Sequence, residues 1–324
     1  MFKPVRVDAD DMLAKVARKK KPLLRIGVLP TMLTLGNLCL GVGAIYMCCR
    51  EFEDVGRRIS PQANLTWKSQ SMEDLAPSYL SVGVWMLIGA IICDALDGRV
   101  ARRTNQSSKF GEQMDSLADL VSWGVAPALM MMTMVRREIY QWNDYQLLGF
   151  DRFRELTVLI GIIYVCCAAL RLARFNVETS LEAASHEGFR GLPSPGAGGA
   201  VCTLIFLHDH IDHAGGWVHT ADLITLILPF CTLAVGLLMV SRVPYRHMGS
   251  VLLRRRKFGQ FIVFLLLIAP VLLYFVQMLA ALAWAFVISG LVKWAYGKYT
   301  GQRPQPVVEA PGSSLDVSLK KNAS

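Results

Sequence analysis

The sequence carries little charge for its length, and it lacks the cysteine spacings and repeats that mark several other protein classes. Only 18% of its 324 residues are Asp, Glu, Lys or Arg, whereas 53% are hydrophobic, which excludes an ordinary soluble enzyme. No C-x-x-C spacing occurs among the eight cysteines, so neither a zinc site nor a thiol redox motif is indicated. No segment repeats at a fixed period, which argues against a solenoid. Residues 1–27 are strongly charged, and we therefore expect no cleavable signal peptide.

Long apolar runs make up most of the chain. The mean hydropathy is +0.38, and a membrane-spanning helix needs about 20 mostly apolar residues to cross a hydrocarbon core of about 30 Å. The sequence therefore predicts an all-α, polytopic membrane helix bundle. The candidate transmembrane helices number about eight, and they lie at residues 28–49, 80–98, 112–135, 154–174, 192–208, 221–241, 258–274 and 276–296.

Basic residues are distributed unequally among the predicted loops. Cytoplasmic loops carry an excess of Lys and Arg. Residues 1–27, the loop at 99–109 and the loop at 242–257 are rich in them, whereas the stretch "HDHIDHAGGWVHTAD" at 208–222 contains none. We therefore expect both termini to be cytoplasmic, and we interpret "HDHIDH" at 208–213 as a solvated loop on the opposite side rather than as a second metal site.

Composition divides the chain into four regions. Residues 1–27 suit a basic amphipathic helix on an anionic membrane surface, with a disordered basic leader as the alternative. Residues 28–247 form the main membrane domain, and residues 248–298 contribute two additional transmembrane helices. Residues 299–324 are rich in Pro, Ser and Gly, which predicts a disordered tail.

Four carboxylates stand at the ends of two predicted membrane helices. Asp94 and Asp97 are three residues apart, and Asp115 and Asp119 are four apart, so each pair shares one face of its helix. The short polar stretch between the pairs makes the two helices antiparallel neighbours, and the four acids are expected to converge. Charged groups in a membrane are costly unless they are compensated. One or two divalent cations would compensate this cluster of hard oxygen ligands, whereas the alternative is that the acids only cap helix ends or pair with nearby arginines.

Small residues and one arginine accompany the acids. Gly98 follows Asp97 directly, Gly111 precedes Asp115 by four residues, and Ala101 lies one helical turn after Asp97. Larger side chains at these positions would exclude a closely approaching ligand. Together with a cationic Arg102, the pattern indicates a site for a metal-bound phosphate or pyrophosphate.

These residues form a pattern that resembles a family signature. The spacing matches that of the CDP-alcohol phosphotransferases, and it reads Asp94-x-x-Asp97-Gly98-x-x-Ala101-Arg102, eight residues, then Gly111-x-x-x-Asp115-x-x-x-Asp119. The resemblance implies a membrane-embedded enzyme that moves a substituted phosphoryl group from a CDP-activated substrate to an acceptor hydroxyl, with CMP as the leaving group. It also implies that two divalent ions, Mg²⁺ or Mn²⁺, are held by Asp94, Asp97, Asp115 and Asp119. Asp119 is in addition the expected catalytic base, and the CDP-binding residues implied are Thr34, Asn37, Gly98, Ala101, Arg102 and Gly111.

Residues outside the signature narrow the resemblance. The stretches "DSLADLVSWGVAPA", "RLARFNVE", "FRGLPSPGAGG" and "LMVSRVPYRH" look like those of membrane-integral bacterial phosphatidylserine synthases, although Thr31 and Trp123 replace the more usual Asn and Phe. This likeness implies CDP-diacylglycerol and L-serine as substrates and membrane lipids as partners. It also implies a homodimer in the bacterial inner membrane, an active site facing the cytoplasm, and no nucleic acid partner.

Further cationic residues lie at two other predicted helix ends. We expect Arg171, Arg174, Asn176, Arg242 and Arg246 to bind the acceptor or a lipid phosphate, because a guanidinium group fits a carboxylate well. The alternative for Arg171 and Arg174 is that they only extend toward the headgroups.

Two alternative functions stay open at this point. A sibling transferase would use choline, glycerol 3-phosphate or inositol as its acceptor. A cation-coupled transporter is the alternative from another class, because carboxylates within a membrane also mark ion pathways. The four acids lie near one predicted surface, and no second half of the chain repeats them, which favours the enzyme.

Overall fold

The computed structural model describes residues 28–58, 78–104, 109–142, 150–181, 191–214, 218–241, 243, 245 and 274–299. Within these ranges the regular elements are all helices, which confirms the predicted all-α class. They are α2 (Val28–Arg58), α3 (Tyr79–Thr104), α4 (Lys109–Asp119), the π-helix η2 (Leu120–Val125), α5 (Ala126–Trp142), α6 (Phe150–Leu181), α7 (Ser194–Ala214), α8 (Val218–Val240) and α11 (Phe275–Tyr299).

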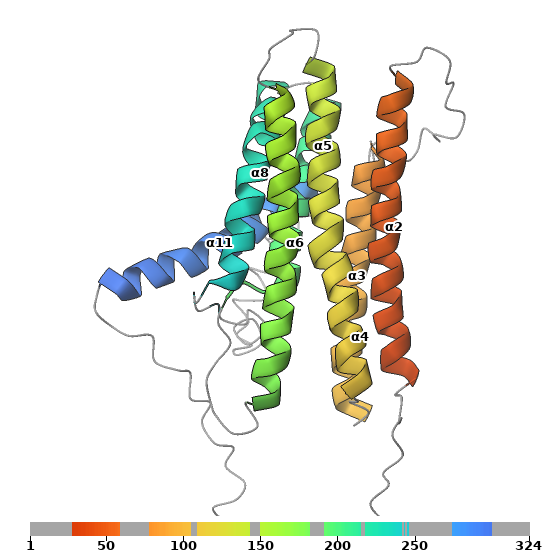
Figure 1. Ribbon diagram of the computed structural model, residues 1–324, viewed down its shortest axis with the longest axis vertical. Coiled ribbons are helices and arrows are strands. Elements are labelled where there is room, and N and C mark those ends of the chain that lie inside the picture. Colours follow the sequence, from red (N-terminus) through yellow and green to blue (C-terminus); the bar gives the residue numbers. More distant parts are fainter. Residues whose placement is uncertain are drawn as a thin grey trace, which may run out of the picture.

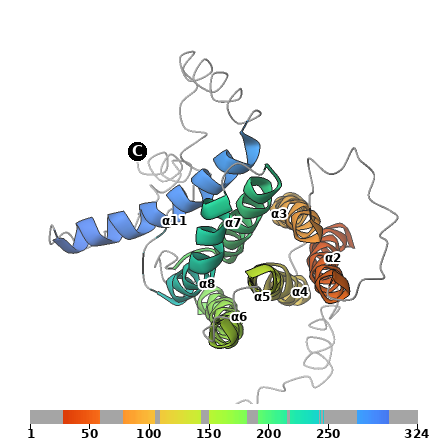
Figure 2. The ribbon, with the colours of Figure 1, turned by 90° about the horizontal axis from the view of Figure 1, so that it is seen from above.

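The helices form an elongated bundle with one element lying across it. In Figure 1, α2, α3, α5, α6 and α8 run lengthwise, and α4, η2 and α5 form one continuous helical run. The view from above in Figure 2 shows α7 and α8 beside α5 and α6, with α11 crossing their outer side. The α2 N-terminus, the α3 C-terminus, α4 and the α6 C-terminus lie at the same end of the bundle (Figure 1).

Six helices of the described chain are long and apolar enough to span a membrane. They cover Pro30–Glu53, Tyr79–Val100, Phe110–Tyr140, Asp151–Val177, His219–Val240 and Phe275–Tyr296. The predicted span at 192–208 lies mostly in α7, which is not among the six. The predicted span at 258–274 lies almost wholly outside the described residues. The total of about eight spans therefore stays a prediction.

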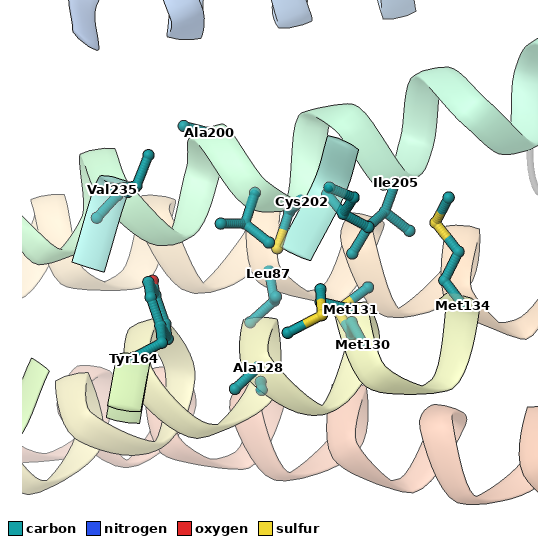
Figure 3. Close-up of a cluster of buried hydrophobic side chains, with 14 of the residues drawn as sticks. Leu87, Ala128, Met130, Met131, Met134, Tyr164, Ala200, Cys202, Ile205 and Val235 are labelled. Carbon is teal, nitrogen blue, oxygen red and sulfur yellow. The ribbon is translucent and has the colours of Figure 1, made fainter. Parts of the chain in front are cut away.

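The centre of the bundle is packed with methionine and small side chains. Met130, Met131 and Met134 on α5 are fully buried against α3 and α7. Tyr164 of α6 is fully buried in the same cluster (Figure 3). Methionine is unbranched and flexible, so it fills the irregular gaps between tilted helices. The "MMMTM" stretch therefore belongs mainly to the core, which holds the α4–α5 run in place.

A turn before α7 is joined to the end of α8. Gly191 has φ +100°, which an L side chain rarely adopts, and its N–H donates to the carbonyl of Val243 at 2.8 Å. The N–H of Leu192 donates to the carbonyl of Leu238 at 3.2 Å. These bonds bring the "GLPSPG" and "LMVSRVPYRH" stretches together and fix where α7 begins.

The interpretation of 208–213 as a solvated loop is wrong, because all six residues belong to α7 and the first two are buried. α7 continues to Ala214, and His208 and Asp209 are only 1% and 3% exposed. Asp209 accepts a hydrogen bond from Arg137 at 2.7 Å and others from the hydroxyls of Ser78 and Ser81. A buried carboxylate is stable only with such partners, and the local sequence does not reveal them because they come from other helices.

Arg137 is the centre of a buried ionic cluster near the C-terminal ends of α2 and α5. Its guanidinium donates to Glu51 at 3.1 Å, to Glu138 at 2.8 Å and to Asp209. Glu51 also accepts from the N–H of Tyr79 at 3.0 Å. This Arg137 cluster (Glu51, Arg137, Glu138, His208, Asp209) therefore joins α2, α3, α5 and α7.

Candidate active site

Three of the four predicted acids converge in space. Asp94 and Asp97 come from α3 and Asp115 from α4, and one carboxylate oxygen from each lies within 4.8 Å of the others. The spacing of three residues puts Asp94 and Asp97 on one face of α3. The connection from Thr104 to Lys109 is short, so α4 returns beside that face and brings Asp115 to it. We call these three side chains the aspartate triad.

Asp119 lies outside the triad and has its own hydrogen-bond donors. Its Oδ1 accepts from the side-chain amide of Asn37 at 3.3 Å and from the indole N–H of Trp123 at 3.1 Å. Asn37 belongs to α2, whereas Trp123 follows Asp119 by one helical turn. The fourth acid is therefore held differently from the other three.

Helix α2 lies against the acids and contributes directly to the site. The hydroxyl of Thr34 donates to Oδ2 of Asp97 at 3.1 Å and lies equally close to the carbonyl oxygen of Pro30. Thr34 and Asn37 are almost fully buried. We predicted both as CDP-binding residues, and the structure gives each a hydrogen bond to an aspartate. A contact with CDP stays a prediction.

The triad fits a divalent cation. Oδ1 of Asp115 is buried and has no hydrogen-bond partner among the described residues, and the same holds for Oδ1 of Asn37. An unpaired buried oxygen is costly unless another group binds it. Oxygen ligands lie about 2.1 Å from Mg²⁺, so opposite ligands are separated by about 4.2 Å. The 4.8 Å spread of the triad is close to that separation.

The acids of the triad do not act as helix caps. α3 extends to Thr104, beyond Asp94 and Asp97, and α4 begins at Lys109, six residues before Asp115. Capping residues lie at or next to a helix end. In the part of the chain with described side chains, no ion pair joins the triad to an arginine or lysine.

A π-helix begins immediately after Asp119, and sequence patterns gave no sign of it. The hydroxyl of Ser122 donates to the backbone carbonyl of Asn37 at 3.2 Å, and the hydroxyl of Tyr164 donates to the carbonyl of Trp123 at 2.8 Å. A Cβ added at Gly41 would clash with Ser122, so α2 approaches η2 closely. Short π-helices are rare and occur often at functional sites.

Two of the predicted acceptor residues on α6 make hydrogen bonds to neighbouring helices. Arg171 donates to the hydroxyl of Ser194 at the start of α7, and the side-chain oxygen of Asn176 accepts from Ser116 of α4 at 3.1 Å. Arg174 is on the same stretch of α6. These bonds connect α6 with α4 and with the turn that begins at Gly191.

Several predicted residues are not tested by the structure. Gly98 lies in α3 and Gly111 in α4, next to the triad in sequence. Ala101 and Arg102 lie in the last turn of α3, but their side chains are outside the described part, as are Arg242 and Arg246. The roles of these residues in binding CDP, acceptor or lipid stay predictions.

A cavity of about 640 Å³ lies elsewhere, between α2, α5 and α6. Its lining includes Cys48, Met132 and Val158 and none of the four acids. Its walls are mainly apolar, and the chemistry of the aspartates identifies the candidate site better than the size of a cavity.

Comparison with known proteins gives a consistent result. The CDP-alcohol phosphatidyltransferase family profile matches residues 27–292. A CDP-diacylglycerol–serine O-phosphatidyltransferase of Helicobacter pylori strain J99 is 33% identical over 225 residues, which are 68% of this chain and 83% of that protein. The enzyme of the same name from Mycobacterium tuberculosis H37Rv is 27% identical over 232 residues, 70% of this chain and 64% of its own length. An archaetidylserine synthase of Methanothermobacter thermautotrophicus is 31% identical over 168 residues, 51% of this chain and 58% of its own. The profile match, the complete signature and the aspartate triad place this chain in the CDP-alcohol phosphatidyltransferase family.

Proposed function

We propose that this protein transfers a phosphatidyl group from CDP-diacylglycerol to the hydroxyl of L-serine and releases CMP. The observation that carries the proposal is the aspartate triad, which brings α3 and α4 together at the residues of the family signature. The names of the relatives supply the acceptor, because the bacterial ones are called serine O-phosphatidyltransferases. The chain would therefore be an integral membrane transferase of phospholipid biosynthesis.

The triad and Asp119 would hold two divalent ions, Mg²⁺ or Mn²⁺. Bound ions of this kind neutralise charge on a pyrophosphate and on the departing phosphate. The chain's own part is to keep the ligands in place. Thr34 holds Asp97 through its hydroxyl, and the unpartnered Oδ1 of Asp115 is available as a ligand. Gly98, Ala101, Arg102 and Gly111, with Thr34 and Asn37, would surround the CDP group.

Asp119 would take the proton of the attacking hydroxyl. Both of its donors bind Oδ1, so Oδ2 is the oxygen that we assign to the proton. A positioned general base of this kind contributes about 10²–10⁴-fold to rate. The two donors hold Asp119 differently from the triad acids, which supports a role beyond that of a metal ligand.

The acceptor carboxylate would lie against α6. Arg171, Arg174 and Asn176 occupy one stretch of that helix, and Arg171 already donates to Ser194 of the adjoining turn. Guanidinium groups have five N–H donors, so Arg171 can keep this bond and bind a carboxylate. Arg242 and Arg246 would supply a second cationic site for the acceptor or the lipid phosphate.

The lipid substrate also explains where the acids lie. Its acyl chains stay in the bilayer while its nucleotide is in water, so the scissile phosphate lies at the boundary. We place that boundary on the cytoplasmic side of a bacterial inner membrane, because the basic loops lie on the side of the acids. We also expect the protein to act as a homodimer.

The test is an assay of the full chain in detergent or liposomes. CDP-diacylglycerol, MgCl₂ or MnCl₂, and one acceptor at a time would be supplied, and CMP and lipid product measured. We expect CMP release with L-serine and its loss in EDTA. Release with choline, glycerol 3-phosphate or inositol but not with serine would assign the chain to a sibling activity. No release with any acceptor would contradict the proposal.

A further inference from the structure

Trp123 contacts the carboxylate of Asp119 in an unusual way. The indole N–H and the amide of Asn37 donate to the same oxygen, Oδ1, from two different elements, η2 and α2. A single hydrogen bond leaves a carboxylate free to turn about its Cβ–Cγ bond. Two donors on one oxygen, fixed by separate helices, oppose that rotation and therefore define where the other oxygen lies.

The indole itself is held firmly. Trp123 is fully buried, and the Tyr164 hydroxyl donates to its backbone carbonyl at 2.8 Å. A Cβ added at Gly198 would lie 3.2 Å from both Cα and Cε3 of Trp123, so α7 packs directly on this residue. A Cβ at Gly124 would likewise lie 3.2 Å from Ala168 Cβ of α6. The ring is therefore a rigid donor, because the helices around it leave little room for a second rotamer.

We infer that Trp123 is a positioning residue, which fixes Oδ1 of Asp119 and thereby directs Oδ2 toward the acceptor hydroxyl. The inference rests on the proposed function. In that reaction the hydroxyl proton passes to Oδ2 of Asp119 and the acceptor oxygen forms a bond to phosphorus. The bond between phosphorus and the CMP oxygen breaks, and its electron pair leaves with CMP. Trp123 does not touch the reacting atoms and acts only through Asp119.

The direct test is Trp123→Phe, which removes the N–H and keeps an aromatic ring. We expect kcat to fall about tenfold, a part of the ~10²–10⁴ that a positioned base contributes. The KM values for serine and CDP-diacylglycerol should stay within about twofold, because the substrate-binding groups are unchanged.

A second variant separates the hydrogen bond from the packing. Trp123→Phe leaves a space beside α7, whereas benzothienylalanine at position 123 keeps the bicyclic ring and replaces the N–H by sulfur. The same fall in kcat is expected for it. The matched control is Trp284→Phe, which also loses an indole hydrogen bond, to the carbonyl of Ala200 at 3.1 Å on α7. We expect kcat of this control to change less than twofold.

A measurement without turnover tests the contact itself. In EDTA, the melting temperatures of Trp123→Phe, Asp119→Ala and the double variant form a double-mutant cycle. If the indole acts on the carboxylate, Trp123→Phe should shift the melting temperature by a smaller amount when Asp119 is absent. A purely structural role of the ring would give the same shift in both backgrounds.

The outcomes separate the two proposals. Failure of the wild-type protein to release CMP with serine contradicts the proposed function. Wild-type turnover together with unchanged kcat in both Trp123 variants contradicts only the role of Trp123. The role of Trp123 would also be overturned if Trp123→Phe shifted the melting temperature equally with and without Asp119. A fall in activity caused only by higher KM values would overturn it as well.

Discussion

Asp115→Asn should stabilise the metal-free protein and abolish its activity. The triad oxygens lie within 4.8 Å of one another, and two unit charges at that distance repel by about 3.5 kcal/mol at an effective dielectric constant of about 20. The substitution removes two such pairs. Asp94 and Asp115 are partly exposed, so solvent screens much of this repulsion, and we expect a net gain of about 1–2 kcal/mol.

Addition of a metal should reverse the order of stability. An ion that binds only the folded state stabilises it by about 2.7 kcal/mol at a concentration one hundred times its Kd. Wild-type protein should gain this amount in MgCl₂ or MnCl₂. Asp115→Asn should gain much less, because its amide is neutral and offers one weakly binding oxygen where the carboxylate offers two charged ones.

Thermal melting in detergent measures both effects. In EDTA the variant should melt about 1.5–3 °C above wild type, since an unfolding entropy of about 2.1 cal/mol/K per residue makes 1 kcal/mol correspond to about 1.5 °C for 324 residues. With saturating metal the wild type should melt higher, and only the wild type should release CMP. Asp151→Asn is the matched control, because Asp151 is 83% exposed and pairs only with nearby Arg154 at 3.4 Å in the described structure.

Two results would refute this reasoning. A variant that melts below wild type in EDTA would show that the triad is not dominated by repulsion. Near-normal CMP release by Asp115→Asn would show that Asp115 is not a required metal ligand, whatever its effect on stability.

Three further outcomes test other parts of the structure. Arg137→Met should lower the free energy of unfolding by about 3–5 kcal/mol, because it leaves buried carboxylates unpaired. Its control, Arg50→Met, removes an exposed pair and should change the free energy of unfolding by less than about 1 kcal/mol. Equal losses in the two variants would contradict the importance of the Arg137 cluster. Gly191→Ala should cost at least about 1–3 kcal/mol, because φ is +100° and the new Cβ would lie 2.6 Å from the Met239 carbonyl oxygen. Gly199→Ala, with nothing within 4 Å of its Cβ, should be neutral or stabilising in the same melting assay. Arg171→Lys should raise the KM for serine about 10- to 100-fold, since hydrogen bonds to charged groups contribute about 1.5–3 kcal/mol. An equal rise in the KM for CDP-diacylglycerol would assign Arg171 to the lipid instead.

Local sequence spacing predicted that four acids converge, and three of them do. Spacings of three and four residues specify one face of a helix, and the short polar connection between α3 and α4 requires an antiparallel return. Both are properties of neighbouring residues. Length and apolar composition likewise predicted the six helices that are long enough to span a membrane, because burying backbone groups in lipid demands a helix.

The partners of these residues could not be predicted in the same way. The Thr34–Asp97 and Asn37–Asp119 bonds join residues 63 and 82 positions apart, and Arg137 meets Asp209 across 72 positions. No local periodicity encodes such pairs, which is why 208–213 was interpreted as a solvated loop. Each pair depends on which faces of the helices meet after packing.

The sequence by itself determined that the chain is a helical membrane protein, that it carries the family signature, and that carboxylates from two neighbouring helices meet. Only the tertiary structure decided that α11 crosses the bundle, with Phe275 stacked on Trp85 of α3 at 5.5 Å. It also decided that Asp119 accepts hydrogen bonds from the indole of Trp123 and the amide of Asn37. The physical reason is that spacing along a helix fixes directions within that helix, whereas contacts between helices depend on close packing of side chains from the whole chain.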